Sequence, residues 1–135
     1  MPVALEIVSP EKLLLSRPVD MVVIPAYEGE LGVLPGHALM IVLLRGGEIR
    51  LYEGQQVIDR MYVSGGFAEI TPERCTVLAS EVIPLPELSK AEGERRLAAA
   101  EEAYVAADKM NMEAVDLAMD RLQSARAMLE LAQAN

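Results

Sequence analysis

Few residues of this 135-residue chain combine into a pattern that could perform bond chemistry. The sequence has one histidine, His37, and one cysteine, Cys75, which excludes a metal site built from several His and Cys ligands. No GxSxG segment or GxxxxGK[ST] loop is present, and RGGEIR and SGGF are interpreted as turn glycines. We interpret His37 as hydrogen-bonded within the turn at Pro35 and Gly36, with a catalytic role as the alternative, and Cys75 as a small buried hydrophobe.

Carboxylates are numerous, but none forms a spaced pair suited to acid–base catalysis. Most are expected on solvated strand faces, among them Glu28, Glu30, Glu48, Glu53 and Glu69. Glu30 stands out because turn glycines lie close on both sides of it and Leu31 and Val33 alternate after it. This pattern predicts that Glu30 projects from an exposed loop, where a solvated turn residue is the simplest interpretation.

Composition limits the class of protein further. Hydrophobic residues make up 52% and aromatic residues 4%, so the core must be aliphatic. The net charge of −9 disfavours nucleic-acid binding and contact with an anionic membrane surface, and favours a neutral or basic protein partner. The longest apolar run, residues 38–44, is too short to cross a bilayer, and no targeting peptide is expected. A single cysteine suits a reducing compartment.

The first 82 residues alternate with the period of β-strands. The strand-like segments are VALEIV, VDMVVI, GEIRLY, QVIDRMYV, FAEIT and RCTVLASEV, separated by Gly and Pro turn signals. Gly46-Gly47 is predicted to be the two-residue loop of a tight hairpin. Many short, evenly spaced strands indicate a β-sandwich or a small barrel over residues 1–83.

The period changes after the prolines of PLPELS, which we interpret as a short linker at residues 84–89. Residues 90–135 then predict a helical hairpin. Ser89 and Glu92 fit a capping box for a helix over 90–106, and Asn111 is the expected N-cap of a helix over 112–133. Each helix has a narrow apolar stripe: Leu97, Ala100, Tyr104 and Ala107 in the first, and Val115, Ala118, Leu122, Ala125, Leu129 and Ala132 in the second.

The alanines in both stripes bury little apolar area, at about 25 cal/mol for each Å². Two interpretations remain open for the hairpin: an ordinary static pair, or a weakly held pair that can move. Residues and spacing alone therefore favour a binding or regulatory protein without catalytic apparatus.

The segment EGELGVLPGHALM, followed by LRGGEIR, resembles the signature of the epsilon subunit of F-type ATP synthases. VALEIVSPEKLLLS, VSGGFAEI and the helical tail are similar to that family too, so the resemblance covers essentially the whole chain. It implies a β-sandwich of about ten strands with a C-terminal antiparallel pair of helices. It also implies a non-catalytic subunit of the rotating central stalk, without a cofactor, at the cytoplasmic face of the bacterial inner membrane. The implied partners are the gamma subunit, the c-ring and the alpha/beta catalytic head.

The resemblance also assigns residues. Glu30 matches the acidic residue that faces the c-ring loops, and Gly32, Pro35, Gly36 and His37 match the turn that shapes this docking surface, so the turn is expected to present Glu30. In many bacterial members the helices extend along gamma and inhibit ATP hydrolysis. Arg121 and Arg126 are the candidates for contact with the beta subunit, although they lie five residues apart and not on one face.

One motif departs from part of the family. Members whose helices bind ATP have an I/L-D-x-x-R-A motif near the first helix, and its Asp and Arg are not matched here, so nucleotide binding is not expected. The alternative to a stalk subunit is a free-standing β-sandwich enzyme or ligand-binding module with a helical dimerisation tail. Such a module would have a pocket lined by perturbed carboxylates, with His37 inside it.

Overall fold

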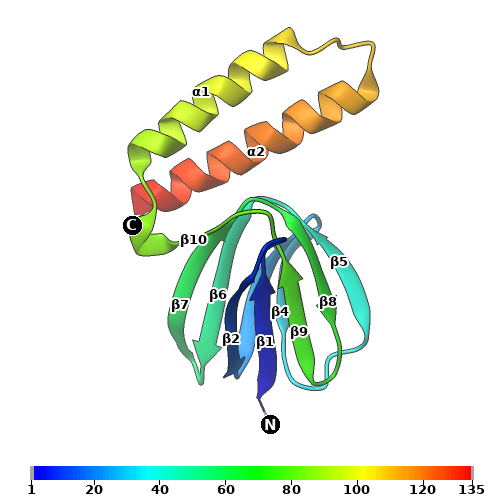
Figure 1. Ribbon diagram of the computed structural model, residues 1–135, viewed down its shortest axis with the longest axis vertical. Helices are drawn as coiled ribbons and strands as arrows, with labels where there is room; N and C mark the ends of the chain where they lie inside the picture. Colours follow the sequence, from blue (N-terminus) through cyan, green and yellow to red (C-terminus); the bar gives the residue numbers. More distant parts are fainter. Residues whose placement is uncertain (1, 135) are drawn as a thin grey trace.

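The computed structural model describes residues 2–134, in which ten strands precede two long helices (Figure 1). The strands are β1 Val3–Val8, β2 Leu13–Val19, β3 Met21–Ala26, β4 Gly29–Val33, β5 Met40–Leu44, β6 Gly47–Glu53, β7 Gln56–Val63, β8 Gly66–Ile70, β9 Arg74–Leu78 and β10 Val82–Pro84. A 3-10 turn, η1 Leu85–Glu87, leads to α1 Lys90–Ala106 and α2 Met112–Ala134.

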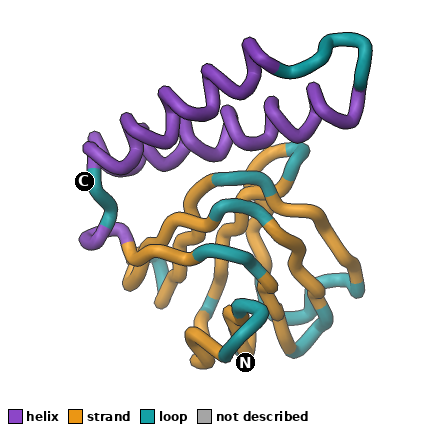
Figure 2. Tube along the Cα trace, turned by 45° about the horizontal axis from the view of Figure 1, so that its top comes forward, coloured by secondary structure: helices purple, strands orange, loops and turns teal. Residues whose placement is uncertain are grey.

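The strands form one sheet that curls into two layers (Figure 2). Its order is β10-β7-β6-β3-β5-β8-β9-β1-β2, with β4 paired to β3 beside this path. β3 joins the layers, because Met21–Val23 pairs with β6 while Ala26 pairs with Leu44 of β5. The predicted sandwich followed by an antiparallel helical hairpin is thereby confirmed.

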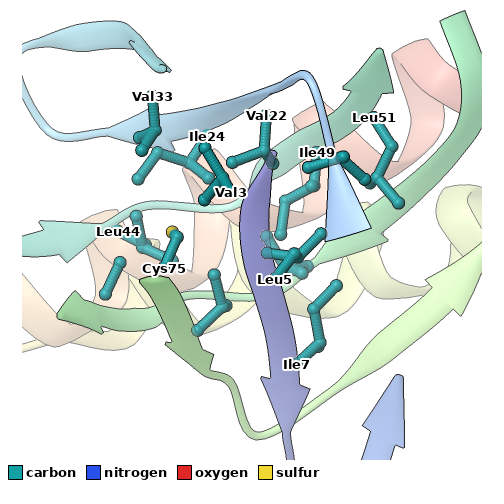
Figure 3. Packing of buried hydrophobic residues seen from close by; sticks show 14 of the residues in the cluster. Val3, Leu5, Ile7, Val22, Ile24, Val33, Leu44, Ile49, Leu51 and Cys75 are labelled. Atoms are coloured by element: carbon teal, nitrogen blue, oxygen red, sulfur yellow. The ribbon is translucent and has the colours of Figure 1, made fainter. Parts of the chain in front are cut away.

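The core between the layers is aliphatic, as the composition requires. Alternate residues of β1 point inward, and Val3, Leu5 and Ile7 are buried against strands from both layers (Figure 3). Cys75 lies in the same cluster, fully buried, which confirms its interpretation as a core residue. Burial raises the pKa of its thiol to about 12, so the thiolate is disfavoured.

The predicted hairpin at Gly46-Gly47 is wrong. β5 pairs with β8 and β6 pairs with β7, so the chain crosses from one layer to the other at these glycines. Glycine is needed at both positions because neighbouring residues leave no room for a side chain. A Cβ on Gly46 would lie 2.5 Å from Ser124 Cα, and one on Gly47 would lie 2.7 Å from Pro25 Cβ.

Four strands were not predicted: β2, β4, β5 and β10, the last of which overlaps only the end of the predicted segment RCTVLASEV. β2 reads LLLSRPV and has few buried residues; it is an edge strand, where Pro18 is tolerated because a ladder bond is not required of it. β4 and β5 have glycines or continuous apolar residues instead of a clear alternation. β3 also begins and ends two residues later than the segment predicted for it.

Both helices begin and end close to the predicted residues. Ser89 Oγ accepts from the amide of Glu92 at 3.1 Å, and Asn111 Oδ1 accepts from the amide of Ala114 at 3.2 Å. The reciprocal half of the capping box is wrong, because the Glu92 carboxylate pairs with Arg95 and Arg96 instead.

The predicted apolar stripes face each other, and their members are buried or half-buried. Two contributors were missed. Gly93 allows close approach of the helices, since a Cβ there would lie 3.1 Å from Leu129 Cα, and Met128 is fully buried. The segment interpreted as a linker contains the last residue of β10 and η1, where Leu85 is buried.

Candidate docking surfaces

Four alternating charges cross the outer face of β4, β3, β6 and β7. Arg50 on β6 donates to both carboxylate oxygens of Glu30 on β4, at 2.6 and 3.0 Å, and to Glu48 at 2.9 Å. Glu48 in turn accepts from Arg60 Nε on β7 at 2.5 Å. The Arg50 side chain spans β3, because Val23 pairs with Arg50 on one side and with Gly32 on the other.

This cluster has a buried centre and exposed ends. The Glu48 side chain is 8% exposed and holds both arginines, whereas the Glu30 side chain is 56% exposed. Hydrogen bonding to Arg50 lowers the pKa of Glu30 and raises the pKa of Arg50, so both stay charged. Because Glu30 is well exposed, solvent screens this pair and limits its contribution to stability.

The structure corrects the predicted position of Glu30. This residue lies within β4, not in a loop, whereas Pro35, Gly36 and His37 lie just beyond the other end of that strand. Pro35 lies five positions after Glu30, which corresponds to about 16 Å at about 3.3 Å per residue. The expectation that the Gly-Pro turn presents Glu30 is therefore wrong.

The turn itself is held mainly by the backbone. The amide of Gly36 donates to Pro72 O at 2.8 Å, which ties this turn to the loop before β9, and Gly36 has a φ of +82°. His37 does make the predicted side-chain hydrogen bond, from Nδ1 to the neighbouring Ala38 O at 2.8 Å. Because that bond reaches the adjacent residue, it fixes the ring without bridging the turn.

A second surface of the sandwich is apolar and exposed. Ile41 and Leu43 on the outer side of β5 are 68% and 66% exposed, and Leu39, just before the strand, is 76% exposed. Phe67, which pairs with Leu43, extends the patch onto β8 and is 40% exposed. We call these four residues the β5–β8 face. The apolar run at residues 38–44 did not predict this face, because an uninterrupted apolar run does not show that every second residue points outward.

The hairpin lies over one end of the sandwich (Figure 1), and several hydrogen bonds join the two. Gln123 on α2 accepts from Gly46 N at 3.0 Å and donates to Gly46 O at 2.6 Å. The next residue, Ser124, donates to Ser64 O at 3.1 Å, and its carbonyl accepts from Tyr62 Oη at 3.1 Å. We call these contacts the hairpin–sandwich interface.

Two further contacts belong to this interface. Arg96 on α1 donates twice to the Glu81 carboxylate, at 2.6 and 2.7 Å, which joins α1 to the loop between β9 and β10. Tyr27, in the turn between β3 and β4, lies beside Asp120 on α2; desolvation and that carboxylate raise the Tyr27 pKa. Burial likewise raises the pKa of Tyr62 to about 12, so both phenols remain neutral donors.

The two arginines singled out in α2 lie on different sides of that helix, as their spacing predicts. Arg126 borders an open cleft of about 600 Å³ between α2 and the sandwich, to which Glu30 and Arg45 also contribute. Arg121 borders a separate hollow of about 460 Å³ between the helices and β7, to which four alanines contribute. Both side chains are exposed. Glu30 and Arg126 thus line the same cleft, whereas Arg121 lines a different hollow.

His37 lines neither of these hollows, so the carboxylate pocket of the alternative interpretation does not form around it. Among residues 2–134, no three His, Cys, Asp or Glu side chains gather closely enough to hold a metal ion. None of the helices in that range is long and apolar enough to cross a membrane.

A curled sandwich with a hairpin attached by polar contacts and an uncovered apolar face defines the class of small assembly subunits that dock onto larger partners. Residues 2–85 match the family described as ATP synthase, Delta/Epsilon chain, beta-sandwich domain. The chain is 68% identical over 129 residues to the ATP synthase epsilon chain of Granulibacter bethesdensis, covering 96% of each chain. It is 49% identical over 132 residues to that of Gluconacetobacter diazotrophicus, covering 98% of this chain and 94% of the relative.

Solved structures agree with these relatives. A chain in the structure of the Euglena gracilis mitochondrial ATP synthase (OSCP/F1/c-ring) superposes with a TM-score of 0.76 at 25% identity, covering 98% of this chain and 81% of that one. A chain of the Tetrahymena thermophila mitochondrial ATP synthase central stalk and c-ring shares the fold, with a TM-score of 0.72 at 12% identity over 98% and 97% of the two chains. The chain belongs to the ATP synthase epsilon-chain family.

Proposed function

We propose that the chain is a non-catalytic subunit of the central rotor stalk of a proton-translocating F-type ATP synthase. In this role it couples rotation of the c-ring, together with gamma, to ATP synthesis in the catalytic head. It is a peripheral subunit at the cytoplasmic face of the bacterial inner membrane. The observation that carries the proposal is the β5–β8 face, an exposed apolar surface on a sandwich whose relatives over nearly the whole chain are ATP synthase epsilon chains.

The β5–β8 face is the proposed docking site for gamma. Leu39, Ile41 and Leu43 expose apolar side chains to water at no benefit to the isolated fold, and burying one such side chain contributes about 1.5–3 kcal/mol. The protein's net charge of −9 would not favour burial of this face against another acidic surface.

The test is capture of gamma by the full chain and by two charge variants. Leu43→Glu places a charge on the β5–β8 face and should weaken gamma binding by at least about a hundredfold, from the lost burial and the desolvation of the charge. Met110→Glu, at a 92% exposed position in the loop between the helices, is the matched control and should bind normally. Equal binding of all three chains would remove this face from the interface, and absence of any binding would remove the proposed function.

Glu30 is the proposed c-ring contact, together with Gly32, Pro35, Gly36 and His37. Since Glu30 and the turn lie at opposite ends of β4, they would meet the ring as two separate contacts. Glu30→Lys reverses the exposed charge and opposes it to Arg50, so ATP-driven proton pumping by the reassembled complex should fall. Unchanged pumping would remove Glu30 from that interface; His37→Ala tests the other contact separately.

The hairpin is the proposed inhibitory element, with Arg121 and Arg126 as contacts to the beta subunit. Support comes from the polar hairpin–sandwich interface, whose hydrogen bonds can exchange with water at small net cost. Replacing both arginines by Ala should raise ATP hydrolysis by the complex while leaving gamma binding intact. Hydrolysis at the unmodified rate would contradict these two contacts without affecting the stalk function.

A further inference from the structure

β5 has one edge without a complete strand partner. Its residues 40–44 pair with β8, but on the opposite edge β3 reaches only Leu44, through Ala26. Leu43 O accepts from Tyr27 N at 3.2 Å on that side. Because the N–H and C=O of one residue in an antiparallel strand point to the same side and alternate along the strand, the amides of Ile41 and Leu43 face this open edge.

β4 lies across from this edge and is an edge strand as well. Among residues 2–134, β3 is its one pairing partner. Pro25 has no N–H and its carbonyl accepts from Arg45 N at 2.9 Å, on the side away from β4. Pro25 and Glu30 are therefore paired without hydrogen bonds to each other. Because such pairs alternate along an antiparallel ladder, the backbone N–H and C=O groups of Glu30 and Gly32 point away from β3.

A groove of about 560 Å³ lies between the two strands, and we call it the β4–β5 groove. It is lined by residues 26–31 and 40–43. Leu31 and Val42, on its two sides, are partly buried and pack against the sandwich core. A segment bound in the groove could contact the apolar side chains of Leu31 and Val42. It could also pair with the free backbone donors and acceptors of β5, and an added β-strand requires both kinds of contact.

Natural proteins protect exposed strand edges with charges, prolines or bulges. β5 reads MIVLL and has none of these, and its outward side chains belong to the β5–β8 face. The edge is therefore continuous with the surface proposed to dock gamma. A second copy of the chain is disfavoured as the occupant because each copy has a net charge of −9.

We propose that the β4–β5 groove receives an extended apolar segment of gamma, which pairs with the free edge of β5 through the backbone of Ile41 and Leu43. This inference rests on the proposed function and specifies how the partner is bound. Alternate side chains of the segment would cover Leu31 and Val42, and the others would lie beside Ile41 and Leu43. Glu28, exposed at the groove, suits a neutral or basic residue at that end of the segment.

The first test is amide hydrogen exchange by NMR on the full chain, free and bound to gamma. Exchange at Ile41 and Leu43 should slow at least about a hundredfold in the complex, because new ladder bonds protect both amides. Val42 and Leu44, already directed at β8, are the internal reference. A complex that forms while Ile41 and Leu43 exchange as in the free chain would overturn edge pairing and leave the proposed function intact. If the amides of Ile41 and Leu43 were protected without gamma, and more strongly at higher chain concentration, the groove would bind a second copy of the chain. That result would also overturn the proposal.

The second test separates backbone from side chain at one position. Ile41→Pro removes the amide that faces the groove, a change that edge strands tolerate, whereas Ile41→Ala keeps it. Affinity for gamma should fall at least about tenfold further in Ile41→Pro than in Ile41→Ala, the loss expected of a backbone bond. Equal affinities would overturn the proposal, and circular dichroism checks that both variants fold. Should Ile41→Pro not fold, the exchange experiment on the unmodified chain decides; failure of that chain to bind gamma would contradict the proposed function itself.

Discussion

The interior of the sandwich and the hairpin–sandwich interface differ in the kind of interaction that holds them. The interior is aliphatic, with Leu5, Ile24 and Ile49 fully excluded from water. The interface relies on the amide of Gln123, the hydroxyl of Ser124 and the Arg96–Glu81 pair. Burial of apolar side chains contributes about 1.5–3 kcal/mol each, whereas a hydrogen bond that replaces one to water contributes about 0.5–1.5 kcal/mol net.

This difference explains how one small chain can contain a fixed part and a releasable part. Losing contact with the hairpin leaves the hydrogen-bonding groups of this interface to water, which can satisfy them, while opening the sandwich exposes its whole aliphatic core. Of the two interpretations left open by the sequence, the polar interface favours the movable hairpin. Four experiments test this difference between the two regions, beginning with the largest expected effect.

Ile24→Ala removes most of a fully buried side chain in β3, the strand that joins both layers. The cavity and lost burial should lower the free energy of unfolding by about 2–5 kcal/mol, measured by urea denaturation. Val105→Ala, at a 79% exposed position of α1, is the control and should change it by less than about 0.5 kcal/mol. Similar losses for both would contradict the view that the sandwich interior dominates stability.

Gly46→Ala should separate the two regions. The added methyl group would lie 2.5 Å from Ser124 Cα, and relieving this overlap should weaken hairpin docking by about 3 kcal/mol. We expect faster proteolysis of α1 and α2 and an unchanged melting transition of the sandwich. Gly32→Ala, whose Cβ would meet Met21 Sδ at an ordinary 3.5 Å, is the control. A hairpin as protease-resistant as in the unmodified chain would mean that the interface is rigid.

Ionisation of the Tyr62 phenol at alkaline pH should weaken docking of the hairpin onto the sandwich. Its pKa is raised to about 12 in the folded chain, so its contribution is complete below the ordinary pKa of 10 and is lost as pH rises towards 12. Two pKa units correspond to about 2.7 kcal/mol at most. NMR signals of α2 should report release of the hairpin over this range. In Tyr62→Phe, the pH dependence of hairpin release that comes from Tyr62 should disappear, and the smaller contribution of Tyr27 should remain. If hairpin release in this variant followed the same pH dependence as in the unmodified chain, Tyr62 would not be its cause.

Gln123→Ala should give the smallest effect. It deletes both hydrogen bonds to Gly46, whose backbone groups can bind water instead, so docking should weaken by about 1–2 kcal/mol. Gln133→Ala, at an exposed position of the same helix, controls for the change in helix propensity. Hydrogen exchange of α2 amides measures both variants, and equal exchange would show that the Gln123 contacts do not hold the hairpin.

Local features of this chain were predictable because their causes lie within a few residues. Ser89 and Asn111 cap helices through bonds to residues three positions on, and the two helices begin where these caps predict. The alternation of Val3, Leu5 and Ile7 likewise identified a half-buried strand. Docking roles for Glu30, His37 and the α2 arginines remain predictions.

By itself, the sequence determined an aliphatic sandwich followed by two capped helices, since composition and short-range periodicity decide which segments form strands or helices. Only the tertiary structure shows that β5 pairs with β8 instead of β6, that Arg50 holds Glu30 over β3, and that Gln123 meets Gly46. These contacts join residues 20 or more positions apart, up to 77 between Gly46 and Gln123. No local propensity selects among such partners, because their choice depends on how all strands share one core.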